Sequence, residues 1–161
     1  VISLLLLRER GFTIPDEAIR QGIAQAKSIT SLKGRWQVLA YNPLTICDTG
    51  HNVDGIKQIL TQLHSLNPKR VHLVFGAVND KDVTTILQLL PKEYTYYFCQ
   101  AQIPRALPVA ELQEKAEKIG LQGDTYETVR EAIAAARGNA APDEVIFIGG
   151  STFVVAEIDE L

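Results

Sequence analysis

The alternation of short β-prone runs with longer amphipathic stretches constrains the fold of this chain more than any other feature. The runs Val71–Phe75 and Val145–Ile148 are continuously β-prone, which is typical of strands that are covered on both faces. Apolar residues recur at helical spacing between such runs, and the predicted helices lie within 56–66, 83–90, 112–119 and 129–136. This alternation predicts right-handed crossovers and a mainly parallel sheet with helices on both faces.

The first strand of the predicted sheet runs against the others. The β-prone runs 36–41 and 44–47 flank Asn42-Pro43, a turn dipeptide, so the two runs are expected to form an antiparallel pair. Further strands are predicted at 94–99 and near Thr125, whereas 153–158 is compatible with a helix or a strand. We therefore predict an α/β fold, a three-layer sandwich around a mainly parallel, Rossmann-like sheet of about six strands.

The first 34 residues follow a different pattern. Residues 1–10 and a stretch that begins at Pro15 predict two short helices, and 28–34 is a polar linker that ends in a glycine. Two short helices cannot enclose a core, and the chain starts at a valine, continues with apolar residues and contains no methionine. We therefore expect a fragment of a longer protein, divided into a helical segment, 1–34, and an α/β domain, 35–161.

Charge and composition argue against several kinds of partner. The net charge is -3 and the sequence has no basic cluster, so we expect no nucleic acid. The apolar residues 1–7 are too few to cross a bilayer and lack the features of a signal peptide, so we expect no membrane association. Cys47 and Cys99 lie in strand-like runs without metal-ligand spacing, which predicts buried free thiols in a reducing compartment, the cytoplasm.

Side chains that can carry chemistry gather in the turn that follows the run 44–47. Asp48 and His51 stand three residues apart there, and Asn52 is a good N-cap for the following helix. This turn lies at the carboxyl end of a strand, where α/β sheets bind ligands, and the helix directs its positive dipole end into it. The turn is therefore suited to an anion, and His51 adds a group that titrates near neutral pH.

Structural interpretations of the same turn stay open. Asp48 can simply accept hydrogen bonds from N–H groups of the turn, and His51 can simply donate to Asp48. A metal cluster of Asp48, His51 and Asp54 is disfavoured because the helix dipole already stabilises Asp54 in the first helical turn. The chain has no phosphate-binding loop, no G-x-G-x-x-G fingerprint and no G-x-S-x-G elbow, so another domain must complete its chemistry.

Five segments, which occur in the family's own order, resemble the folylpolyglutamate synthase and dihydrofolate synthase family, relatives of the Mur peptide ligases. The turn D-T-G-H-N at 48–52 resembles the family's D-[G/A/S]-[A/G]-H-N motif. The others are G-R at 34–35, after Lys33 in place of the usual proline, F-G-A-V-N-D-K-D at 75–82, P-R-A at 104–106 and G-S-T-F-V-V-A-E at 150–157. The resemblance covers residue 35 to the end well, and the first residues match the family's last helices before the linker.

The resemblance implies an ATP-dependent amide ligase. Such enzymes phosphorylate a substrate carboxylate with ATP, and the amino group of glutamate then attacks the acyl phosphate. A larger N-terminal domain carries the P-loop and the Mg²⁺ ligands, while a smaller C-terminal domain closes over ATP and helps to receive glutamate. By resemblance, this chain is a C-terminal domain of the Mur ligase type with a remnant of the ATP-binding domain at 1–34, and it is expected to be inactive alone. The implied partners are the P-loop domain of the same protein, a folate and L-glutamate.

The family's site residues fall on matching positions of this sequence. By resemblance, Arg35 is expected to reach the ATP phosphates, Asp48 to contact the nucleotide or the closing linker, and His51 to lie near the reacting centre. Ser151 is expected by resemblance to lie near the incoming glutamate, and Arg105, at a strand end, is expected from its charge to help hold glutamate. Asp48 and His51 are the expected catalytic residues, and His51 is also expected to contact glutamate. The structural alternatives are a solvated linker cation for Arg35, a helix cap for Ser151 and a salt bridge for Arg105.

Several interpretations stay open beside these. The segment Asp80-Lys81-Asp82 forms either a surface loop with internal ion pairs or a contact to another domain. His64 and His72 have no partners in the sequence and are predicted to be structural. Two other functions fit the same pattern, namely a Mur-type ligase for a different amino acid and a non-catalytic ligand-binding module of the same fold.

Overall fold

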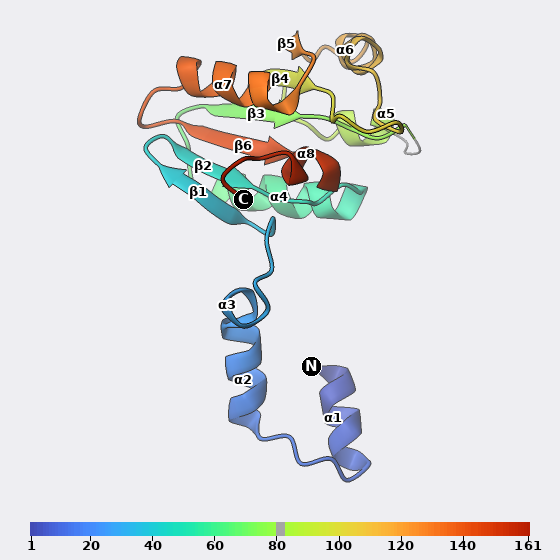
Figure 1. Ribbon diagram of the computed structural model, residues 1–161, viewed down its shortest axis with the longest axis vertical. Helices are drawn as coiled ribbons and strands as arrows, with labels where there is room; N and C mark the ends of the chain where they lie inside the picture. The colour runs from blue at the N-terminus through green and yellow to red at the C-terminus, as the bar shows by residue number, and fades with distance from the viewer. Residues whose placement is uncertain (80–82) are drawn as a thin grey trace. The chain divides into compact units, whose positions relative to one another are not determined.

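The computed structural model of this chain describes residues 1–79 and 83–161, which form two compact units, 1–33 and 34–161 (Figure 1). The first unit contains the helices α1 (Ile2–Glu9), α2 (Asp16–Ala24) and α3 (Ala26–Thr30). The sequence predicts one helix from Pro15 onward, whereas the structure interrupts it at Gln25, where φ is -108° and ψ is 13°.

The helices of the first unit expose their apolar side chains. As far as the structure describes α1, α2 and α3, none of their residues is buried. The large apolar side chains exposed in this unit are Val1, Ile2, Leu5, Leu6, Phe12, Ile23, Ile29 and Leu32. Because helices of this length gain most of their stability from packing, the unit has too little buried surface to be stable by itself.

The second unit is built on one mixed sheet. Its strands among the described residues are β1 (Gln37–Tyr41), β2 (Leu44–Cys47), β3 (Val71–Phe75), β4 (Thr95–Cys99), β5 (Gly123–Tyr126) and β6 (Val145–Gly149). Their spatial order is β1-β2-β6-β3-β4-β5, with β1 antiparallel to β2 and every other pair parallel (Figure 1). The predicted sheet, including its antiparallel first strand, is confirmed.

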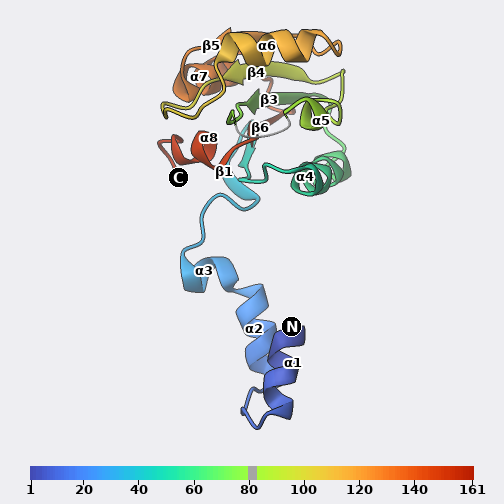
Figure 2. The same cartoon turned by 90° about the vertical axis from the view of Figure 1, so that its right-hand side faces the viewer.

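Helices cover both faces of this sheet and complete the predicted three layers. The helices α4 (Val53–Ser65), α5 (Val83–Leu87) and α6 (Val109–Glu117) pack on one face, and α7 (Val129–Asn139) and α8 (Thr152–Ala156) pack on the other (Figure 2). The segment that the sequence leaves open between helix and strand, 153–158, is mostly helical, since α8 extends to Ala156.

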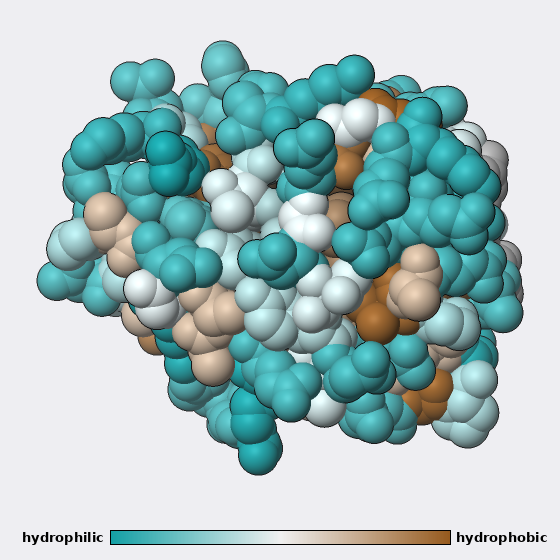
Figure 3. All heavy atoms as spheres, turned by 90° about the horizontal axis from the view of Figure 1, so that it is seen from above, coloured by the Kyte–Doolittle hydropathy of each residue, from teal (hydrophilic) through white to brown (hydrophobic). Residues whose placement is uncertain are grey.

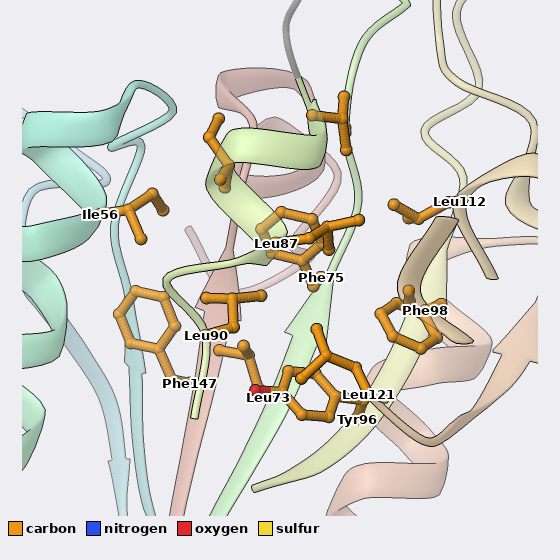
Figure 4. Packing of buried hydrophobic residues seen from close by; sticks show 14 of the residues in the cluster. Ile56, Leu73, Phe75, Leu87, Leu90, Tyr96, Phe98, Leu112, Leu121 and Phe147 are labelled. Atoms are coloured by element: carbon orange, nitrogen blue, oxygen red, sulfur yellow. The ribbon is translucent and has the colours of Figure 1, made fainter. Parts of the chain in front are cut away.

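The core on the side of α4, α5 and α6 is rich in aromatic rings. Figure 4 shows side chains of these helices, such as Ile56, Leu87 and Leu112, pointing toward Phe75 and Phe98 of the strands and their neighbours. Each such side chain contributes about 1.5–3 kcal/mol by leaving water. This face therefore fixes the strands, and with them the turns that follow the strands.

The core on the side of α7 and α8 contains both cysteines. Cys47 and Cys99 are free and buried, as the sequence predicts. Burial raises the pKa of the Cys99 thiol, so this side chain behaves as a small apolar group. The core on this face is built from smaller side chains, including Val129, Ala132 and Ala136 of α7.

A buried polar network crosses this second core at the amino ends of the strands. The ring of His72 bonds through Nδ1 to the hydroxyl of Tyr97 and through Nε2 to the carboxylate of Glu144, both at 2.9 Å. Glu144 also accepts the N–H of Ala141 at 2.9 Å, and Asn139 donates to the Tyr97 hydroxyl at 3.2 Å. His72 is thus structural, as predicted, but its partners lie far away in the sequence.

Replacing Glu144 by glutamine is expected to lower the free energy of unfolding at pH 7 by about 1.5–3 kcal/mol, the range for hydrogen bonds to charged groups. The Ala141 N–H and the His72 ring lower the pKa of Glu144 below its ordinary value of 4.5. A lowered pKa stabilises the fold fully above that ordinary value, and the stabilisation is lost as the pH falls through the folded value. The difference between wild type and E144Q should therefore shrink on acidification.

Urea denaturation at a series of pH values from 7 down to about 3 measures this difference. The neighbouring Asp143 is a matched control, because its carboxylate is 63% exposed and pairs with Lys69 at 3.3 Å. D143N should change stability by less than about 0.5 kcal/mol. A difference for E144Q that does not vary with pH would contradict the assignment.

The surface of the second unit is polar at its β5 edge. Viewed from the side of β5, α6 and α7, hydrophilic side chains prevail and apolar ones occupy small, separate areas (Figure 3). Of the helices that the structure describes, none combines the length and the apolar character that a membrane span requires.

Candidate active site

The candidate site is formed by two adjacent turns at the carboxyl edge of the sheet. Because β2 and β6 are parallel neighbours, with Cys47 opposite Ile148, the turn after β2 and the turn after β6 start side by side. The ladder continues one residue further, since the Asp48 N–H donates to the Ile148 carbonyl at 3.1 Å. Asp48 and His51 lie on the first turn, and Ser151 lies on the second.

Asp48 is held by two backbone N–H groups. Its Oδ1 accepts from Gly50 and its Oδ2 accepts from Trp36, both at 2.7 Å, and the residue is only 9% exposed. The bond to Gly50 is the local turn contact that the sequence leaves open. The bond to Trp36 reaches the segment that follows the linker 28–34. The contact of Asp48 with the nucleotide or the closing linker stays a prediction.

Arg35 lies next to this carboxylate without being fixed by it. Its Nη1 is 3.9 Å from Oδ1 of Asp48, and the arginine side chain is 55% exposed. An ion pair of this length, with an arginine side chain this exposed, contributes little stability. The guanidinium therefore needs little energy to turn toward another anion.

His51 bonds within its own turn. Its Nδ1 lies 2.9 Å from the carbonyl oxygen of Thr49, so Nδ1 is the donor, and in the neutral ring Nε2 carries the lone pair. The Nδ1 bond of His51 is thus made to Thr49, within the turn that also carries Asp48. This tautomer gives the half-buried imidazole a nitrogen that can accept a proton.

The predicted cap of the next helix is confirmed. Asn52 precedes α4 and accepts the N–H of Gly55 at 2.8 Å. Asp54 lies in the first turn of α4, where its charge is favourable. Among residues 1–79 and 83–161, no group of three or more His, Cys, Asp or Glu side chains is placed to hold a metal ion.

Ser151 caps α8, as its structural alternative states. Its hydroxyl accepts the N–H of Phe153 at 3.2 Å, and the residue is 2% exposed. Its role toward glutamate stays a prediction, and the cap does not exclude it, because a hydroxyl can accept one hydrogen bond and donate another.

Arg105 reaches the same turn through an aromatic ring. Its guanidinium carbon lies 4.7 Å from the centre of the Phe153 ring, and cation–π contacts of this kind are favourable. The Arg105 carbonyl accepts the N–H of Asn79 at 2.9 Å, which joins the loop after β4 to the loop after β3. The predicted loop Asp80-Lys81-Asp82 lies outside the described residues.

The sequence does not indicate two residues that contribute to this site, Trp36 and Phe153. Trp36 acts through its backbone N–H, and every residue except proline carries one, so the sequence has no signal for it. Phe153 belongs to the motif at 150–157, but its contact with Arg105 depends on how two distant loops meet.

The fold and the two turns define a class of protein, the C-terminal domain of Mur-type ligases. The family described as Mur ligase, glutamate ligase domain, matches residues 34–152. The chain belongs to this family.

The relatives of the chain include folylpolyglutamate and dihydrofolate synthases, as the resemblance of the five segments predicts. It is 33% identical over 159 residues to a probable bifunctional folylpolyglutamate synthase/dihydropteroate synthase of Haloferax volcanii, covering 97% of this chain and 18% of that protein. It is 30% identical over 162 residues to the dihydrofolate synthase/folylpolyglutamate synthase of Escherichia coli K12, covering 99% of this chain and 36% of that protein.

Solved structures agree with these relatives. A bifunctional folylpolyglutamate synthase/dihydrofolate synthase with Mn, AMPPNP and L-glutamate bound superposes with a TM-score of 0.82 at 29% identity, covering 95% of this chain and 36% of that one. The Escherichia coli protein FolC in complex with DHPP and ADP gives 0.81 at 30% identity, with the same coverage. The chain thus spans little more than a third of the length of these solved relatives.

Proposed function

We propose that this chain is the C-terminal, glutamate-accepting part of an ATP-dependent ligase that joins L-glutamate to dihydropteroate or a folate through an amide bond. The observation that carries the proposal is the grouping of Arg35, Asp48, His51 and Ser151 on the linker and two adjacent turns of a Mur-type glutamate ligase domain. The two adjacent turns provide one wall of a cleft, and a P-loop domain of the same protein provides the other.

The residues present fit a nucleotide that is held mainly by another domain. The sequence lacks a P-loop, whereas Arg35 offers an exposed fork of donors that Asp48 holds only loosely. When bound, ATP with a divalent cation, which we propose to be Mg²⁺, supplies the activation of the substrate carboxylate. The solved relatives described above were obtained with ADP, or with AMPPNP and Mn.

Arg35 and Asp48 have distinct tasks in this proposal. Arg35 neutralises charge that develops on the transferred phosphoryl group, which is the main way in which proteins accelerate phosphoryl transfer. Asp48 keeps the linker in place through Trp36 and contacts the nucleotide when the two domains close. The unit 1–33, whose apolar side chains are exposed, belongs in this proposal to the ATP-binding domain.

His51, Ser151 and Arg105 face glutamate in the same proposal. The Ser151 hydroxyl and the Arg105 guanidinium bind its carboxylates, the former by donating its proton and the latter by charge. Because Nδ1 of His51 bonds to the Thr49 carbonyl, Nε2 of the neutral ring is an acceptor and can take a proton from the glutamate amino group as the amide forms. A cytoplasmic location completes the proposal, because glutamate, ATP and two free thiols are all compatible with it.

The direct test is a ligation assay with the whole protein that carries this chain. Purified protein is incubated with ATP, Mg²⁺, L-glutamate and either dihydropteroate or a folate, and products are identified by mass spectrometry. The proposal predicts an amide product that requires ATP and forms together with one ADP and one phosphate. Amide formation only with a different amino acid, or no amide with any acceptor, would overturn it.

Replacing His51 by alanine is expected to lower kcat of this ligation about 100-fold or more, the lower end of the range for losing a proton acceptor, or to raise KM for glutamate. The melting temperature should stay close to that of the wild type, because the side chain is half-buried and its Nδ1 bonds within its own turn. His64 is the matched control, since it is exposed on α4 and H64A should leave both constants unchanged. Normal kinetics with a lowered melting temperature would make His51 structural.

A further inference from the structure

We propose that Trp36 is a positioning residue, whose left-handed backbone, clamped by the Asp48 carboxylate, presents the Arg35 guanidinium at the edge of the cleft. This inference deepens the proposed ligase function and rests on it for the target of Arg35. We call residues 34–36 together with Asp48 and Thr49 the linker clamp.

The backbone on both sides of Arg35 is left-handed. Gly34 has φ of 68° and Trp36 has φ of 41°. Glycine adopts this region freely, and a Cβ at Gly34 would lie 2.8 Å from Thr49 and 2.9 Å from Val155. A bulky residue such as tryptophan rarely adopts it and keeps it only where the surroundings impose it.

The turn after β2 imposes this conformation through backbone hydrogen bonds. The Trp36 N–H donates to Asp48 Oδ2 at 2.7 Å, and the Thr49 N–H donates to the Gly34 carbonyl at 2.8 Å. The Gly34 N–H donates to the side chain of Gln37 at 2.8 Å. The linker is therefore fastened on both sides of Arg35.

The ring of Trp36 adds a second anchor. It is half-buried and packs at a tilt of 38° against Phe147 of β6, with 6.2 Å between the ring centres. Phe147 is itself 1% exposed and belongs to the core. Backbone and ring together hold residue 36, while the arginine between the two left-handed residues keeps an exposed side chain.

The clamp survives when Arg35 changes partner. Asp48 receives two N–H donors at 2.7 Å, whereas the guanidinium contact is longer, at 3.9 Å. The departure of Arg35 toward a phosphoryl group therefore leaves the buried carboxylate satisfied. Arg35 can act on a ligand without dissolving the geometry that aims it.

Substitutions at position 36 separate this role from simple packing. Trp36→Phe keeps an aromatic ring, Trp36→Gly keeps the N–H and relaxes the left-handed backbone, and Trp36→Val disfavours that backbone most because it is β-branched. A clamp predicts that kcat of the whole ligase decreases in the order Phe, Gly, Val, with Val about tenfold or more below Gly. A packing role predicts the order Phe, Val, Gly, which would overturn the proposal.

The control is another left-handed residue far from the site. Asn67 has φ of 48° and follows α4 at the opposite edge of the sheet, so N67V also places a β-branched residue in a left-handed backbone. It should lower the melting temperature and leave kcat unchanged. An equal loss of kcat in both variants would mean that instability, and not the position of Arg35, causes it.

A second measurement does not need ligase activity. Amide hydrogen exchange of Trp36, followed by NMR in this chain, should accelerate about tenfold or more in Asp48→Ala, while the amide of the buried strand residue Val74 stays protected. Unchanged exchange at Trp36 would overturn the clamp whatever the enzyme does. Accelerated exchange together with a wild-type protein that forms no amide would instead overturn the proposed function and leave the clamp standing.

Discussion

Replacing Arg35 by alanine lowers kcat of the proposed ligase by about 100-fold or more, the scale on which single donors to a developing oxyanion or phosphoryl charge act. KM for the folate substrate should stay within a factor of about three, because the arginine is proposed to act on charge that appears in the transition state. Steady-state kinetics of ADP release, with each substrate varied in turn, measure both constants. Because the Arg35 side chain is exposed, R35A should not unfold the domain.

Two further variants define the meaning of that result. Arg35→Lys keeps the charge but loses the planar fork, so its kcat should lie between those of the wild type and R35A. Arg130, on α7, is a matched control because its side chain is also exposed and pairs with a carboxylate. The partner is Asp159, near the end of the chain, at 2.8 Å. R130A should leave kcat unchanged, and an unchanged kcat in R35A would remove Arg35 from the mechanism.

Replacing Gly150 by alanine should lower the free energy of unfolding of the second unit by about 3 kcal/mol or more, the sum of a left-handed penalty and overpacking. Gly150 has φ of 89°, and a Cβ there would lie 2.5 Å from the Phe75 ring and 2.6 Å from the Gly76 carbonyl. The turn after β6 must therefore shift, and Ser151 shifts with it. Urea denaturation gives the free energy, and the ligation assay should show a raised KM for glutamate.

Gly138 offers the opposite case on the same chain. It lies in the last turn of α7, and a Cβ there would meet nothing within 4 Å. G138A should therefore stabilise the unit, by at most roughly 0.5–1 kcal/mol, the difference between alanine and glycine in the middle of a helix. If G150A unfolded at the same urea concentration as the wild type, the tight contact between the turns after β3 and β6 would be wrong.

The sheet could be predicted because its signals are local. The β-prone runs 71–75 and 145–148 mark central strands without reference to any other part of the chain, and Asn52 is a recognisable cap. The turns that carry Asp48 and Ser151 lie close together because their strands are parallel neighbours. Alternating strands and helices predict a parallel sheet, but they do not tell which strands are neighbours in it. The six-residue stretch 153–158 is too short for its hydrophobic periodicity to distinguish a helix from a strand.

The contacts that aim the site could not be predicted. Asp48 receives the N–H of Trp36 from 12 residues away, and His72 meets Glu144 across 72 residues. The sequence offers no sign of the left-handed backbone at Trp36, because bulky residues adopt it only under tertiary constraint. Motifs thus identified the side chains that carry charge, while the groups that orient them depend on the folded chain.

In the proposed ligase, this chain supplies half of a site that works only against a nucleotide-loaded partner domain. Titration of AMPPNP with Mg²⁺ into the chain and into the whole protein, followed by the heat of binding, tests this division of the site. We expect saturable binding, at about micromolar Kd, to the whole protein only, with no saturation of the chain alone up to about 1 mM. Micromolar binding to the chain alone would contradict it, because the chain would then hold a complete nucleotide site of its own.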